Sequence, residues 1–300
     1  MNCVKSSFCF YFILFVELSF FPLFYIHNLF QKKKKKHYSR NRRDVQTRTV
    51  FVETHEWAGY PFVREKKIKN GRTFLCGINF QLKRFELIKR DSAYQIDYTV
   101  TISDLGKYPT YDIQTVKSRC DRVLPVSNAG LDFSGYSAFY DFVKDKPNSY
   151  VILSNSSVNA CIDDFLNDYI EYMENNLHVG MLGISYCTKM YQTLIRNNFT
   201  PHLQSFFLLT TIDVLRQVVA VNNNVFPGKG ISNKQLLIRE GEIRLSQLVM
   251  KLGYNLSVVN PLNGVPFKFT SYVDWSMPKG DIRQSLNYPN KITSILRGVL

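Results

Sequence analysis

The stretch SYVILSN at residues 149–155 decides the fold, together with CIDDFLNDYIEYMENN at 161–176 and HVGMLGISY at 178–186. The first and third pieces are continuous apolar runs of strand length, as expected of strands that are buried on both faces. The piece between them has the pattern of a helix. Strands that alternate with helices indicate an α/β fold with a mixed, mainly parallel sheet and helices on both faces.

The same alternation extends in both directions along the chain. Upstream, we expect a helix at 130–143 and strands at 51–57, 72–80, 94–104 and 122–128. Downstream, we expect strands at 205–210 and 255–261 and helices at 212–220 and 242–254, the last of which is closed by Gly253. In sheets of this kind, ligands bind at the carboxyl ends of the strands.

The composition is that of an ordinary globular chain. Its 300 residues suffice for one large domain or two small ones. Hydrophobic residues make up 45% and charged residues 21%, which excludes a mostly disordered protein, a collagen and a coiled-coil rod. The six cysteines include no CxxC pair, so they indicate reduced, structural thiols rather than a disulfide scaffold or a zinc site.

The positive charge is concentrated near the N-terminus. Residues 32–43 carry eight of the fourteen net positive charges, and residues 44–300 carry the other six. A basic run of this kind resembles that of a nucleic-acid binder, but next to an apolar segment it favours the anionic surface of a membrane. We therefore expect contact with lipid headgroups and no nucleic-acid partner.

Residues 8–30 form the adjoining apolar segment, FCFYFILFVELSFFPLFYIHNLF. At about 1.5 Å per residue its length matches a bilayer core of about 30 Å, although Glu17 and Pro22 argue against a simple span. This divides the chain into an N-terminal apolar helix as membrane anchor (1–31), a basic linker (32–50) and a folded domain (51–300). The positive-inside rule places the domain in the cytoplasm, behind a single span of the inner (plasma) membrane.

Two other interpretations of the N-terminus remain open. The Phe-rich and Lys-rich runs could be translated AT-rich DNA upstream of the true start, in which case the protein is cytoplasmic. A cleaved signal peptide fits less well, because the apolar run is too long and no small-residue cleavage site follows it.

Familiar nucleotide-binding and hydrolase motifs are absent from the sequence. The chain contains no GxxxxGK[ST], GxGxxG, GxSxG or HExxH pattern. Their absence argues against kinases, dehydrogenases, serine hydrolases and metalloproteases.

Four other stretches combine turn residues, polar side chains and strand ends. They are SNAGLDFSGYSAF (127–139), YVILSNSSV (150–158), PHLQSFFLL (201–209) and GEIRLSQLVMKLGYNLSVVNP (241–261). Their order and spacing resemble glycosyltransferases of the GT-A fold, in the broad inverting family-2 style, and most of all the rhamnan-synthesis-type enzymes of bacterial polysaccharide assembly. The resemblance implies a Rossmann-like sheet and an inverting hexosyltransferase that moves a sugar from a nucleotide-sugar donor to a surface polysaccharide or a lipid-linked glycan.

The resemblance also assigns a donor site. In the first stretch, glycines between a strand and a helix let the backbone approach a ligand, and a helix N-terminus attracts phosphate. An ordinary turn with Asp132 as helix cap explains the same pattern. Asp104 lies where related enzymes contact the nucleobase, and Arg283 or Lys279 could neutralise the leaving diphosphate. The expected donor-binding residues are Asp104, Asn128, Gly130, Asp132, Asn155, Ser157 and Arg283.

The second stretch bears on a metal ion. Asn155-Ser156-Ser157 stands where the family keeps a carboxylate that holds Mg²⁺ or Mn²⁺ against the donor diphosphate. Mg²⁺ prefers one or two carboxylates plus phosphate oxygens, and this sequence offers an amide and hydroxyls instead. We therefore expect a weak or absent cation requirement, with Asp132 or Asn155 as the only candidate ligands.

The last two stretches supply the acceptor site and the base. In the rhamnan-type enzymes a pattern similar to His202, Gln204 and Ser205 lies near the acceptor, and these side chains can hydrogen-bond sugar hydroxyls. Glu242 falls where the family keeps its catalytic base, which takes the proton from the attacking hydroxyl. The assignments of His202 and Glu242 also have ordinary structural explanations. A lone histidine is usually structural, and a carboxylate that opens the helix at 242–254 stabilises that helix electrostatically.

The main alternative is a transferase-like protein that has lost its activity and only binds glycan or nucleotide. A further alternative is a nucleic-acid binder that uses Lys32–Arg43. Turnover of a sugar nucleotide separates the first interpretation from the inactive one. Loss of nucleic-acid affinity on deletion of residues 32–43 would identify the protein as a nucleic-acid binder.

The charge asymmetry predicts the topology. A C-terminal reporter that is active only outside the cytoplasm should stay silent, because the Lys/Arg excess follows the apolar segment. A strong extracytoplasmic signal would overturn the orientation and, with it, access to cytoplasmic sugar nucleotides. Mass spectrometry of the native N-terminus checks the alternative start separately.

Overall fold

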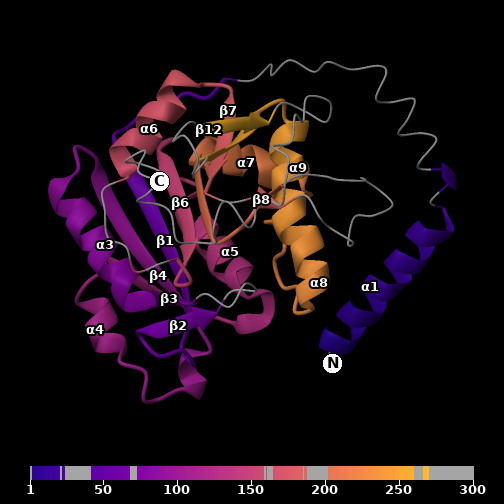
Figure 1. The fold of residues 1–300 in the computed structure, drawn as a ribbon, viewed down its shortest axis with the longest axis horizontal. Helices are drawn as coiled ribbons and strands as arrows, with labels where there is room; N and C mark the ends of the chain where they lie inside the picture. Colours follow the sequence, from indigo (N-terminus) through magenta and orange to yellow (C-terminus); the bar gives the residue numbers. More distant parts are fainter. Residues whose placement is uncertain are drawn as a thin grey trace.

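The computed structural model describes residues 2–20, 22–23, 42–67, 73–158, 160, 165–184, 186–187, 202–259 and 266–269. Within them, the predicted α/β fold with a mainly parallel sheet between two layers of helices is confirmed (Figure 1). The C-terminal segment that includes Lys279 and Arg283 lies outside the described residues.

One sheet of eight strands forms the centre. In sheet order the strands are β12 (Pro266–Phe269), β11 (Asn255–Val259), β7 (Val179–Gly183), β10 (Phe207–Thr211), β6 (Tyr150–Asn155), β1 (Thr49–Trp57), β4 (Gln95–Ser103) and β5 (Arg122–Val126). β10 and β12 run against their neighbours, and all the other pairs are parallel. The carboxyl ends of six strands therefore share one edge of the sheet.

The direction of β10 brings distant segments to that same edge. β10 pairs antiparallel with β6, so that Phe207 at its start lies beside Ser154 near the end of β6. The residues that precede β10 therefore meet the residues that follow β6. β9 (His202–Leu203), which pairs with β8 (Tyr186–Cys187), lies just before this point in the chain.

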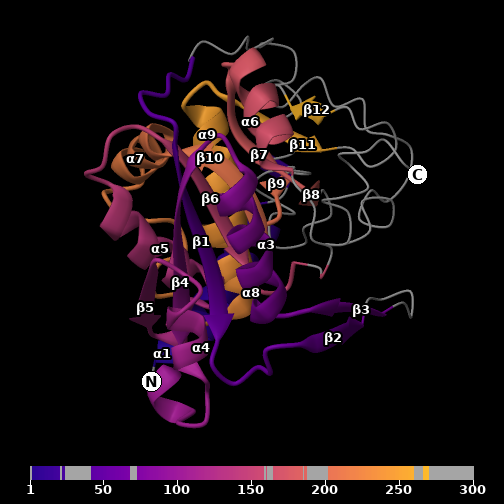
Figure 2. The same cartoon turned by 90° about the vertical axis from the view of Figure 1, so that its left-hand side faces the viewer.

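Helices cover both faces of the sheet. One face carries α3 (Ile78–Asp91), α4 (Ile113–Lys117) and α6 (Leu166–Asn175), and the other carries α5 (Asp132–Val143), α7 (Ile212–Val221), α8 (Lys234–Leu237) and α9 (Arg244–Lys251) (Figures 1 and 2). Short helical turns η1 (Leu105–Lys107) and η2 (Asn128–Gly130) follow β4 and β5. The sheet and its helices form two apolar cores, one on each side.

The apolar runs of the strands explain the two cores. On β1, Val50 and Val52 belong to one core and Phe51 to the other, because successive side chains of a strand point to opposite faces. On β6, Ile152 and Leu153 divide in the same way. Continuous apolar sequence is therefore what a strand between two helical layers requires.

The structure differs most from the sequence-based expectation at two elements. The strand expected at 72–80 stops early, because β3 (Thr73–Cys76) ends before Gly77 and α3 follows. Gly77 has a φ of +130°, and an added Cβ would lie 2.2 Å from the backbone oxygen of Phe62. β3 instead pairs with β2 (Arg64–Lys67) in a hairpin that extends away from the sheet (Figure 2).

The helix expected at 242–254 begins earlier. Asn233 caps α8 by accepting a 2.9 Å hydrogen bond from the amide of Leu236, and the chain continues through a π-helical segment, η4 (Ile238–Ile243), into α9. Glu242 therefore lies inside a helical run, and the expectation that it opens a helix is wrong. Gly253 follows the helix with a φ of +88°, as predicted.

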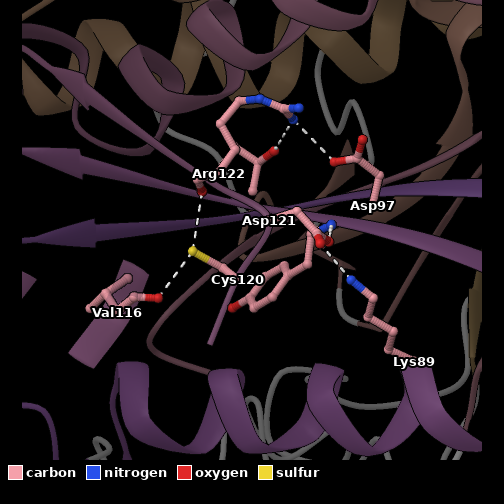
Figure 3. Close-up of polar contacts among 8 residues, drawn as sticks. Lys89, Asp97, Val116, Cys120, Asp121 and Arg122 are labelled. Atoms are coloured by element: carbon pink, nitrogen blue, oxygen red, sulfur yellow. Dashed lines mark hydrogen bonds and ion pairs between the residues drawn. The ribbon is translucent and has the colours of Figure 1, made fainter. Parts of the chain in front are cut away.

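Polar contacts hold the edge strand β5 in place (Figure 3). Asp121 accepts hydrogen bonds from the amide of Tyr98 (2.9 Å) and from the ammonium group of Lys89 (2.5 Å). The Cys120 thiol lies 3.1 Å from the carbonyl oxygen of Val116, and burial raises the pKa of that thiol. Among the described residues, Cys9, Cys76 and Cys120 are free thiols, as predicted for them.

Arg43, the last residue of the basic run at 32–43, belongs to the fold. Arg43 is buried, and its guanidinium donates hydrogen bonds to the backbone carbonyls of Val179 and Met173. Its own amide donates to the carbonyl of Leu177 over 2.9 Å. The expectation that the whole run 32–43 faces lipid headgroups is therefore wrong for Arg43.

The N-terminal segment contains a helix, α1 (Asn2–Ser19), that exposes large aromatic side chains, among them Phe8, Tyr11, Phe12 and Phe15. In the part of the chain that the structure describes, no helix combines the length and the apolar character that crossing a bilayer requires. The last seven residues of the predicted apolar segment, 24–30, lie outside the described residues.

Close packing of α5 on the sheet predicts a stability effect. A Cβ added at Gly135 would lie 2.2 Å from Oγ1 of Thr101 and 2.5 Å from Nδ1 of His55. Overpacking costs about 1–3 kcal/mol, and alanine regains part of it through helix propensity, so Gly135→Ala should lower the free energy of unfolding by about 2 kcal/mol. Urea denaturation measures this.

Gly106→Ala is the matched control, because no atom lies within 4 Å of the Cβ it would add. It should unfold close to the wild-type midpoint. A Gly135→Ala variant as stable as the control would contradict the packing of α5 described here.

Candidate functional site

A cavity of about 530 Å³ opens at the edge where the parallel strands end. It is bounded by the ends of β1 and β6, by the segment after β5, by the residues that precede β10 and by the α8–η4 helical run. This is the edge at which α/β sheets bind ligands.

Most of the residues expected from the sequence meet in this cavity. Seven of them line it directly: Asn128, Asp132, Asn155, Ser157, Gln204, Ser205 and Glu242. Asp104 and His202 lie behind the lining, where each contacts a residue that does line it. The Gly130 amide donates to Oγ of Ser134 over 2.8 Å, so this glycine closes a turn within the chain and does not line the cavity.

Asp132 and Asn155 are joined directly at the cavity wall. The Asn155 amide donates a 2.7 Å hydrogen bond to Oδ2 of Asp132, and its own Oδ1 accepts from the amide of Ser157 over 2.9 Å. The N-cap of α5 is Leu131 and Asp132 is the first residue of the helix, so the interpretation of Asp132 as the helix cap is wrong. Leu131, just before it, has a φ of +46°, which is strained for a leucine.

These donors fit a divalent cation poorly. Asn155 uses both ends of its amide within the protein, which leaves the Asp132 carboxylate as the one charged ligand at this point of the described structure. In the described part of the chain, no three His, Cys, Asp or Glu side chains converge on a common point. Three side-chain cations also line the same cavity: Arg64, Lys66 and Lys234.

A buried polar row lies beneath the cavity floor. Thr101 donates a 2.5 Å hydrogen bond to Glu53, and its oxygen lies 2.9 Å from Nδ1 of His55. Burial raises the pKa of Glu53 well above its usual value and lowers that of His55. Burial therefore favours the neutral form of both side chains. Because Thr101 gives its hydrogen to Glu53, His55 donates from Nδ1 and keeps Nε2 as an acceptor.

The carboxylate of Glu242 is held from two sides. Its Oε2 accepts the amide of Ser205 over 2.8 Å, and its Oε1 lies 3.2 Å from Nε2 of His202. Burial acts to raise the pKa of Glu242, but the hydrogen bond and charge of His202 and the amide of Ser205 together lower it below its usual value. Tyr136 fixes the same loop by donating to the carbonyl of Ser205 over 2.6 Å. Glu242 is therefore an ionised, well-positioned carboxylate.

Aromatic side chains cluster around Trp57, which contacts Asp104, at one part of the cavity wall. The indole N–H of Trp57 donates to Asp104 over 3.2 Å, and the Trp57 ring packs edge-on against Tyr60 and Tyr108 at centroid distances of 4.8 and 5.2 Å. Trp57 and Tyr60 line the cavity. A planar aromatic ring next to a carboxylate suits a flat, hydrogen-bonding ligand such as a nucleobase.

Arg64 is built into the wall of the cavity. Its guanidinium donates to Ser156 over 2.7 Å, lies 3.4 Å from the Glu56 carboxylate and stacks 4.1 Å from the centroid of the Tyr60 ring. Burial raises the pKa of Glu56 to about 7, and the charge of Arg64 counteracts this. The Glu56–Arg64 pair therefore carries a net positive charge for part of the time at neutral pH.

Sequence reasoning missed the residues that β1 and the hairpin contribute. They are His55, Trp57, Tyr60, Arg64 and Lys66, together with Lys234 from α8. The sequence could have indicated two of these residues, Arg64 and Lys66. They are separated by one residue in a strand, and alternate residues of a strand share one face, so both cations point the same way. His55 and Trp57 alternate in the same manner at the end of β1.

The Glu56 environment predicts a pH effect on stability. The folded protein binds the Glu56 proton more tightly than the unfolded chain, whose carboxyl has the usual pKa of 4.5. The stability that the tighter binding of this proton adds to the folded state is fully present below pH 4.5, and it is lost as the pH rises through about 7. Glu56→Gln mimics the protonated form at every pH. Between pH 5 and pH 8 the variant should therefore gain about 2–3 kcal/mol of stability relative to wild type.

Denaturant unfolding at several pH values between 5 and 8 measures this gain. Glu65→Gln removes an exposed carboxylate from β2, so it is the control and should change the pH dependence little. Parallel stability curves for wild type and Glu56→Gln would contradict the assignment.

The sequence matches no protein-family model and no curated protein.

Proposed function

We propose that this protein is an inverting glycosyltransferase of the GT-A type, which moves a sugar from a nucleotide-sugar donor to a surface polysaccharide or a lipid-linked glycan. The observation that carries the proposal is Glu242, an ionised carboxylate that lies in a cavity at the carboxyl edge of the sheet. The order of the sequence stretches and the mixed sheet with its reversed strand β10 support the same assignment.

Inverting transfer needs one base and one leaving group. Glu242 takes the proton from the acceptor hydroxyl while the hydroxyl oxygen forms its bond to the anomeric carbon of the donor sugar. The bond from that carbon to the diphosphate breaks on the opposite face, and its electron pair leaves with the phosphate oxygen. A base with a lowered pKa is ready to accept the proton at neutral pH, and His202 stabilises its ionised form.

The remaining lining residues divide between donor and acceptor. Trp57 and Asp104 form the end of the cavity that suits a nucleobase. Asp132 and Asn155 present a carboxylate and an amide to sugar hydroxyls, whereas Gln204 and Ser205 lie next to Glu242, where the acceptor must reach the base. No step in this mechanism uses a metal ion, because the donors present fit one poorly.

The membrane is part of the proposal. An N-terminal anchor followed by basic residues from Lys32 onward would hold the domain at the anionic inner surface, where lipid-linked acceptors lie. The aromatic side chains that α1 exposes, among them Phe8 and Phe15, are suited to lipid contact.

An inactive glycan- or nucleotide-binding protein is the second candidate. The observation that favours it is the engagement of both Glu242 oxygens, by Ser205 and by His202, which is also what a purely structural carboxylate would show. Transfer kinetics separate the two candidates.

Glu242→Gln should keep donor binding and the fold but slow transfer about 10²–10⁴-fold, because general-base catalysis contributes that much. The measurement is single-turnover transfer from a panel of nucleotide sugars, with a thermal melt of the same protein. Glu240→Gln is the matched control: its side chain is 39% exposed and pairs with Arg239, so transfer should stay near the wild-type rate.

Wild-type turnover by Glu242→Gln would refute the base assignment. Donor binding without transfer by the wild-type protein would favour the inactive candidate. A variant that melts far below wild type would show that Glu242 is mainly structural.

A further inference from the structure

The cavity carries a concentration of positive charge that the mechanism above does not use. Arg64 and Lys66 project from the same face of β2, and Lys234 enters from the start of α8. The Arg64 side chain is only 12% exposed and is held by Ser156, Glu56 and the Tyr60 ring. One of the three cations is therefore fixed in position before any ligand binds.

The three cations are close enough to affect one another. Burial lowers the pKa of Lys66, and the positive charges of Arg64 and Lys234 act in the same direction, while Asp132 opposes them. Like charges gathered at a partly buried wall repel each other, and an anion with several charges relieves this repulsion. The arrangement suits a ligand that brings several negative oxygens between the hairpin and α8.

The positive charge of these three side chains also explains why a divalent cation fits the cavity poorly. Asp132 offers one carboxylate, already hydrogen-bonded to Asn155, in a cavity where Lys66 and Arg64 supply positive charge of their own. Guanidinium and ammonium groups are the side chains that neutralise phosphate oxygens without a metal. The charge that a metal ion would bring to a diphosphate is thus already present in the protein.

We propose that Arg64, Lys66 and Lys234 form a metal-independent subsite for the diphosphate group of a nucleotide donor. The proposal deepens the function proposed above and rests on it for the identity of the full donor. It assigns to these three residues the role that the sequence resemblance had given to Lys279 or Arg283. The subsite places the leaving diphosphate between β2 and α8, beside the nucleobase end at Trp57, because Arg64 stacks on Tyr60 and Tyr60 packs against Trp57.

The test uses the full-length protein and inorganic pyrophosphate, which contains neither sugar nor nucleoside. Calorimetric titration in the presence of EDTA should show saturable binding. Lys66→Gln and Lys234→Gln should each weaken it roughly tenfold or more, because hydrogen bonds to charged groups change affinity by at least that factor. Lys66→Arg keeps the charge and should retain most of the affinity.

Lys117→Gln is the matched control, because it removes the same charge from an exposed position on α4 that does not line the cavity. It should bind pyrophosphate like wild type. If Lys66→Gln does not fold, Lys234→Gln decides the test, since Lys234 is exposed and its side chain is not needed for the core.

Three results overturn the subsite. Pyrophosphate that binds only after Mg²⁺ or Mn²⁺ is added shows that a metal bridges it to Asp132. If pyrophosphate binds in EDTA and neither Lys66→Gln nor Lys234→Gln weakens the binding, the anion binds elsewhere. If pyrophosphate binds neither in EDTA nor with added metal ions, the proposed subsite does not exist. Failure of the proposed function gives a different pattern: pyrophosphate binds and the variants weaken it, but no nucleotide sugar is turned over.

Discussion

The candidate site depends on the reversal of one strand. β10 runs against β6 and β7, so its first residue, Phe207, pairs with Ser154 at the edge where the parallel strands end. At about 3.3 Å per residue, a parallel β10 of five residues would place Gln204 and Ser205 about 16 Å away, at the opposite edge. The reversal is what allows the Ser205 amide to hold Glu242 in the same cavity as Asn155.

Two buried carboxyl groups at this edge have opposite protonation preferences. Glu53 has a raised pKa because burial removes it from water, and the hydrogen bond from Thr101 counteracts this only in part. Glu242 is also buried, but His202 and the Ser205 amide outweigh burial and lower its pKa. Titratable groups whose environments shift their pKa values in opposite directions are typical of sites with acid–base chemistry. Here burial favours the neutral form of Glu53, whereas His202 and the Ser205 amide favour the ionised form of Glu242.

The sequence predicts the strands of the sheet well, because a strand between two helical layers must be apolar on both faces, as Ile152 and Leu153 are. It does not predict the direction of β10, since buried parallel and antiparallel strands have the same apolar pattern. Glu242 could be found from its motif, although the helix around it starts earlier, at Lys234. Arg64 and Lys66 were missed because a short charged strand is hard to distinguish from a solvated surface until its partners are known.

The central claim is that one cavity at this edge binds a nucleotide sugar through segments that lie far apart in the sequence. Hydrogen–deuterium exchange of the full-length protein, with and without each of a panel of nucleotide sugars, tests it most directly. The account predicts that one donor slows amide exchange together at residues 55–66, 128–134, 155–157, 204–206 and 234–242, which border the cavity. Protection by no donor, or protection confined to other segments, would contradict it.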